Sequence, residues 1–148
     1  MPHYVRSNDS AAFAAAVASA AAHGEPSEED LFITRAVLYT ASTRPVHGTV
    51  TSLARAKDVL ARYPEAAGHA VPATPLIHFL ELLLEALEKR SHVLVDVLLG
   101  KYESSLDRDP SLEELTQKCS DMWAPKPVAP GGGLFGDLFR SMLMPGGA

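Results

Sequence analysis

The amino-acid sequence predicts an all-α protein in which antiparallel helical hairpins stack as a fragment of a TPR-like α-solenoid. Apolar residues recur at spacings of three and four in several segments, which is the period of an amphipathic helix. A capping residue followed by proline, at Thr74-Pro75 and at Asp109-Pro110, is typical of a helix start. No segment shows the strict alternation of a long strand. We therefore expect a helical-repeat domain over residues 1–124, followed by a Pro/Gly-rich linker and a short, flexible amphipathic tail over 125–148.

The first two helices are delimited by capping residues and glycine. We expect the first helix to begin behind Asp9 or Ser10 and to stop at Gly24, a natural left-handed terminator. Ser27 is the expected cap of a second helix that ends near Ser42. Apolar residues of the second helix cover more than one stripe, so it is predicted to be sandwiched between neighbours. These residues are Phe32, Ile33, Ala36, Val37 and Tyr39.

A break over Pro45–Gly48 precedes a third helix, which is predicted to end at Pro64. Its apolar face consists of Leu53, Ala56, Leu60 and Tyr63. The stretch Pro64–Ala73 has no helical period and is expected to be an exposed loop or a short hairpin.

The fourth helix, which starts at Pro75, is apolar around nearly its whole circumference. Its polar residues form one thin ridge of His78, Glu81, Glu85 and Glu88. This apolar surface is larger than short neighbouring helices are expected to bury. Two interpretations stay open: the helix is core, or it offers a groove to a partner.

Two further helices complete the domain. One is expected over Ser91–Tyr102, ending near Gly100, with an inner face of Val93, Leu94, Val97 and Leu98. The other begins behind Asp109, with an inner face of Leu112, Leu115, Cys119 and Met122.

Composition narrows the classes of function. The 148 residues, 47% apolar and 21% charged, fit one soluble domain. The net charge of −5 is mixed in sign along the chain, so nucleic-acid binding is not expected. Cys119 is the single cysteine, which fits a cytosolic protein without disulfides. The apolar run Leu76–Leu87 is too short to span a bilayer, so no integral membrane segment is expected.

No residues form a pattern suited to catalysis. The six histidines are never spaced four apart or adjacent to the cysteine, so no metal site is expected. Cys119 lies on an apolar stripe and is interpreted as a packing thiol. Asp107 and Asp109 flank a helix entry, where capping explains them better than acid–base chemistry. Gly131–Gly133 lacks the strand and lysine of a phosphate loop. We therefore predict no catalytic residue, metal or cofactor, and no enzymatic activity.

If the C-terminal tail is helical, its large apolar side chains share one face. Burying each of its large side chains is worth about 1.5–3 kcal/mol, so a docking surface is expected on a partner, on the domain itself or on a membrane. The membrane alternative would make the chain a peripheral membrane-binding helical protein. The predicted docking residues are Leu134, Phe135, Leu138, Phe139 and Met142.

Four segments, in their order and spacing, resemble a known family. They are Glu29–Leu38, Pro75–Leu84, Tyr102–Pro110 and Gly132–Met142. The chain is similar to the C-terminal half of the Golgi-to-ER-traffic protein four family, a scaffold in the guided entry of tail-anchored proteins. The resemblance implies a non-enzymatic cytosolic adaptor for targeting tail-anchored proteins to the ER.

The resemblance also implies the partners. In the family, the N-terminal half holds a tail-anchor-targeting ATPase, and the C-terminal half holds a ubiquitin-like-domain protein or a Bag-type chaperone cofactor. Only the second surface is expected here, with the ATPase linked indirectly. A projecting loop and the following helix grip the partner, which implies the binding residues Val71, Pro72, Leu76, Ile77, Leu80 and Leu84.

Overall fold

The computed structural model describes residues 2–43 and 51–127, and within these ranges its only regular elements are helices. The predicted all-α class is confirmed, and the packed array of helices is solenoid-like. The elements are α1 (Pro2–His23), a 3₁₀ turn η1 (Pro26–Glu28), α2 (Glu29–Ala41), α3 (Ser52–Ala67), α4 (Pro75–Glu88), α5 (His92–Lys101), α6 (Glu103–Leu106) and α7 (Pro110–Trp123).

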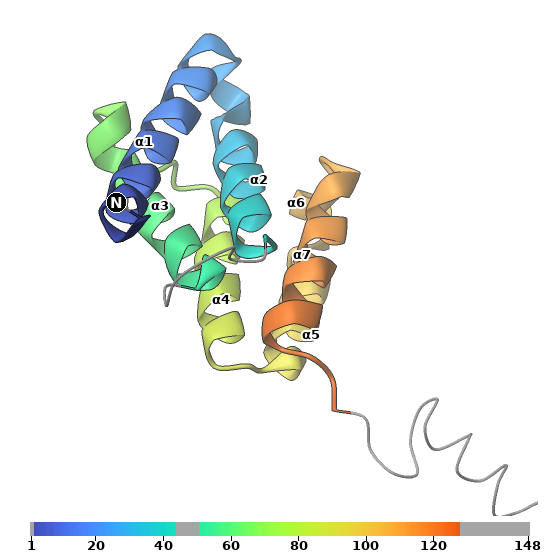
Figure 1. Cartoon of the computed structure of the whole chain (residues 1–148). Coiled ribbons are helices and arrows are strands. Elements are labelled where there is room, and N and C mark those ends of the chain that lie inside the picture. The colour runs from blue at the N-terminus through green and yellow to red at the C-terminus, as the bar shows by residue number, and fades with distance from the viewer. Residues whose placement is uncertain (1, 44–50, 128–148) are drawn as a thin grey trace, which may run out of the picture.

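The helices pack in a layered array with α2 and α4 at its centre. Figure 1 shows α1 and α2 as one hairpin, and α4 and α5 as another. Helix α2 contacts α1, α3, α4 and α7, so its predicted sandwiched position is confirmed. Tyr39 is the exception on this helix, since its side chain is exposed.

Side-chain caps start α4 and α7 where the sequence predicts them. Thr74 Oγ1 accepts the Ile77 amide at 3.3 Å, and Asp109 Oδ1 accepts the Ser111 amide at 2.9 Å. Each cap satisfies an amide that has no partner inside its own helix.

The predicted starts of the first two helices are wrong. Helix α1 begins at Pro2, because a capping residue does not start a helix when the residues before it are also helical. Ser27 lies inside η1, and α2 begins at Glu29 without a side-chain cap. The carboxylate of Asp30 contacts Arg108 instead.

The predicted end of α3 at Pro64 is also wrong. Proline removes one amide donor, but α3 continues to Ala67 and ends at Gly68. Gly68 has φ +81° and donates its amide to the Pro64 carbonyl at 2.9 Å, which is a left-handed glycine cap. The loop after α3 is therefore shorter than predicted and contains no hairpin. The predicted break over 45–48 lies outside the described residues.

Helix α4 is the central helix of the core. The expectation that its apolar surface is larger than its neighbouring helices can bury is therefore wrong. Helices α2, α3, α5, α6 and α7 all pack on it. Its apolar residues except the half-buried Leu82 are buried, and its predicted polar ridge is exposed. The buried residues are Leu76, Ile77, Phe79, Leu80, Leu83, Leu84, Ala86 and Leu87.

The predicted inner face of α5 is largely wrong. Val95 and Leu98 face the core, whereas three of the four predicted residues, Val93, Leu94 and Val97, are exposed. In α7 the predicted inner face is confirmed, since Leu112 and Cys119 are fully buried and Leu115 and Met122 are half-buried.

Polar contacts tie α2 to its neighbours and lower the pKa values of three carboxyl groups. Burial alone would raise the pKa of Glu29, but hydrogen bonds with Tyr63 Oη at 2.6 Å and His69 Nε2 at 2.7 Å outweigh it and lower that pKa. Burial also opposes the lowered pKa of Asp30, which follows from its hydrogen bonds with Arg108. The Ser111 amide lowers the pKa of Asp109.

We expect these carboxylates to make the fold acid-sensitive. Because their native pKa values are lowered, the unfolded chain binds protons first, so their stabilisation is complete above the unfolded pKa of about 4 and is lost as the pH falls toward the native values. Urea unfolding at neutral pH and at about pH 3 measures this loss. In Asp30→Asn the difference between the two pH values should be smaller. A wild-type midpoint that does not change with pH would contradict the assignment.

Candidate partner-binding groove

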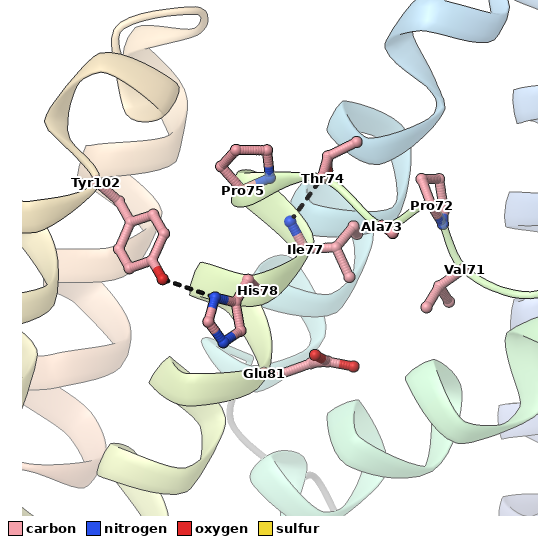
Figure 2. A pocket seen from close by; sticks show the side chains of 9 residues that line it. All are labelled: Val71, Pro72, Ala73, Thr74, Pro75, Ile77, His78, Glu81 and Tyr102. Carbon is pink, nitrogen blue, oxygen red and sulfur yellow. Dashed lines mark hydrogen bonds between the residues drawn. The ribbon is translucent and has the colours of Figure 1, made fainter.

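Two solvent-open hollows lie along the polar ridge of α4. The first, about 670 Å³ in volume, lies between the loop after α3, the first turns of α4 and the residue that follows α5 (Figure 2). It is lined by Val71, Pro72, Ala73, Thr74, Pro75, Ile77, His78, Glu81 and Tyr102.

The second hollow, about 490 Å³, lies between α3 and α4. It is lined by Lys57, Leu60, Ala61, Pro64, Val71, Glu81, Leu84, Glu85 and Glu88. Because Val71 and Glu81 line both hollows, the two lie next to each other on the surface. We call the two hollows together the α4 groove.

A hydrogen-bonded pair forms one wall of the α4 groove. Tyr102 Oη lies 2.8 Å from His78 Nδ1, and the two rings meet edge to face at 6.0 Å between centroids. Figure 2 shows this pair on the side of the hollow opposite Val71 and Pro72. The hydrogen bond and the ring contact hold the two side chains against each other in this wall.

The rim of the α4 groove is acidic. Glu88 pairs with Lys57 at 2.7 Å, and Glu85 Oε1 lies 4.0 Å from Lys89 Nζ. Glu81 is exposed, and within the described ranges it forms no ion pair. A basic side chain entering between the two hollows would therefore meet an uncompensated carboxylate.

No cluster of three metal-ligating side chains occurs in residues 2–43 and 51–127, and no helix there is long and apolar enough to cross a bilayer. Burial raises the pKa of the Cys119 thiol to about 12, so the thiol stays protonated at neutral pH and is not a poised nucleophile.

The structure separates the six predicted binding residues into three groups. Val71 and Pro72 are half-buried and line the α4 groove. Ile77 and Leu84 are buried but reach its floor. Leu76 and Leu80 are fully buried and line neither hollow. The predicted tail-docking residues, Leu134 onward, lie outside the described residues.

Most of the groove lining was absent from the predicted set, including three residues of the first hollow: His78, Glu81 and Tyr102. The polar ridge on α4 was visible in the sequence, and two of the three residues belong to it. Their role follows from the place where the ridge emerges, which depends on how the loop and α5 pack.

Comparison with known proteins identifies the family. The family model of Golgi to ER traffic protein 4 (GET4) matches residues 1–143. The chain belongs to the Golgi to ER traffic protein 4 family. Its resemblance to that family in sequence is thereby confirmed.

Curated relatives give the same answer. The chain is 32% identical over 141 residues to Protein GET4 of Arabidopsis thaliana, covering 95% of this chain and 42% of the relative. It is 29% identical to the Golgi to ER traffic protein 4 homolog of Dictyostelium discoideum, covering 92% and 41%, and 28% identical to that of Bos taurus, covering 95% and 44%. The chain thus spans less than half the length of these relatives.

Proposed function

We propose that this Golgi to ER traffic protein 4 family member is a non-enzymatic cytosolic adaptor in targeting tail-anchored membrane proteins to the ER. Its α4 groove binds a segment of a ubiquitin-like-domain protein or a Bag-type chaperone cofactor, and through other parts of the assembly this links it indirectly to a tail-anchor-targeting ATPase. The observation that carries the proposal is that Val71 and Glu81 line both hollows, which places the two hollows side by side along α4.

The lining of the groove defines the chemistry of the bound segment. Val71 and Pro72 keep apolar surface open to solvent, and Ile77 and Leu84 give an apolar floor. A partner segment with one apolar anchor in each hollow buries this surface. A lysine or arginine between the anchors pairs with Glu81.

A charge placed on the shared wall should abolish binding. Val71→Asp puts a carboxylate on the wall that both hollows share. We expect the Kd for the partner segment to rise about 30-fold, which corresponds to losing one hot-spot contact of about 2 kcal/mol. Isothermal titration measures the change. The matched control is Ala70→Asp, because Ala70 is exposed in the same loop and lines neither hollow. Equal affinity of the two variants, both folded by circular dichroism, would contradict the groove assignment.

Charge reversal tests the electrostatic half of the proposal. Glu81→Lys should slow association and remove much of the salt dependence of binding, whereas Glu114→Lys, which makes the same change on an exposed part of α7, should not. A salt dependence that is the same in both variants would show that the partner brings no basic side chain to Glu81.

A further inference from the structure

Helix α5 carries an exposed apolar face. Val93 is 59% exposed, Leu94 43% and Val97 57%. Val93 and Val97 are one helical turn apart on the side of α5 opposite the buried Val95 and Leu98, and Leu94 lies at the edge of this face, toward Leu98. No other part of the described chain covers this face, which is unusual for three neighbouring aliphatic side chains on one short helix.

A glycine extends the same face. Gly100 lies one turn after Val97, inside α5, where glycine weakens a helix relative to alanine. Its backbone is not left-handed, and a Cβ there would meet nothing within 4 Å. Neither conformation nor packing within the described residues requires glycine. A glycine on a helix surface does, however, allow another segment to approach the backbone closely.

The chain leaves the described structure beside this face. Helix α7 packs on α5, and the chain leaves the end of α7 near α5 (Figure 1). Just after α7, Lys126 Nζ lies 3.4 Å from Asp96 Oδ2. The residues from Pro127 to Leu134 reach at most about 23 Å when extended, and α5 is about 15 Å long. The amphipathic tail therefore begins within reach of every residue of the α5 face.

We propose that the tail Leu134–Met144 docks in cis on the α5 face, with its apolar side chains against Val93, Leu94 and Val97 and its closest approach at Gly100. The short tether raises the local concentration of the tail to the millimolar range, so a weak contact is enough to hold it. None of these α5 residues lines the α4 groove, so the docked tail leaves the groove open.

A thiol placed under the tail tests the proposal in the full chain. Val97→Cys adds one accessible thiol, since the native Cys119 is buried. A tail docked about nine-tenths of the time slows maleimide labelling of this thiol about tenfold. Adding Phe135→Asp and Phe139→Asp should restore fast labelling, and so should adding Gly100→Leu, which fills the space needed for close approach. Glu65→Cys, on an exposed part of α3, should label at one rate in all backgrounds.

Three results would overturn the proposal. Equal labelling of Val97→Cys with and without the tail changes would show that the tail does not cover α5. Protection that strengthens with protein concentration would assign the face to a second copy of the chain. Fast labelling in buffer, together with tail-dependent flotation on phosphatidylcholine–phosphatidylserine vesicles, would assign the tail to a membrane.

Discussion

Leu80→Ala is expected to lower the free energy of unfolding by about 2–5 kcal/mol, because it removes a fully buried side chain from the central helix. Leu80 is 0% exposed and lies in the core with Phe79 and Leu83. Packing from both sides leaves the site little freedom to collapse around the cavity, so the loss should lie well above that of a surface change. Urea unfolding followed by circular dichroism measures it.

The neighbouring Glu81 supplies the control. Glu81→Ala changes an exposed side chain on the same turn, and its effect on stability should stay within about 0.5 kcal/mol. If Leu80→Ala instead kept wild-type stability and lost only partner binding, Leu80 would be a surface anchor, as the family resemblance implied, and α4 would not be the central helix of the core. The two outcomes differ in the unfolding midpoint, so they do not depend on having the partner in hand.

Local signals in the sequence were reliable where one short-range interaction decides the structure. Thr74 and Asp109 cap helices because each needs only an amide two or three residues away. The predicted helix end at Pro64 was wrong because the proline removes only one hydrogen bond. Helix α3 tolerates that local loss and continues to Gly68, which caps it in the left-handed conformation.

Sequence alone did not reveal which apolar surface stays open. An apolar helix such as α4 has the same composition whether it packs against its own chain or against a partner, and the number of neighbours decides. Helix α5 shows the opposite case: Val93 and Val97 are aliphatic, like core residues, but their side chains are exposed to solvent. The α4 groove arises because the loop carrying Val71 and the turn carrying Tyr102 approach the polar ridge from opposite sides.

Arg108→Ala is expected to lower the free energy of unfolding by about 2–3 kcal/mol, because it leaves a buried carboxylate without its partner. Nη1 and Nη2 of Arg108 donate to the two oxygens of Asp30 at 2.8 and 3.0 Å, and Nη2 also donates to the Ser27 carbonyl at 3.1 Å. The Asp30 side chain is 4% exposed and that of Arg108 36%, so water screens the arginine and keeps the loss below that of a fully buried pair.

The pH dependence separates this ion pair from simple packing. Hydrogen bonds from Arg108 lower the pKa of Asp30, so the deficit of Arg108→Ala should be largest at neutral pH and should shrink as Asp30 is protonated in acid. Arg62→Ala, which breaks a half-buried pair with Asp58 within α3, is the control and should cost at most about 1 kcal/mol. An Arg108→Ala deficit that stays constant into acid would mean that the arginine acts through its aliphatic stem, and that α2 is held to the turn before α7 by packing alone.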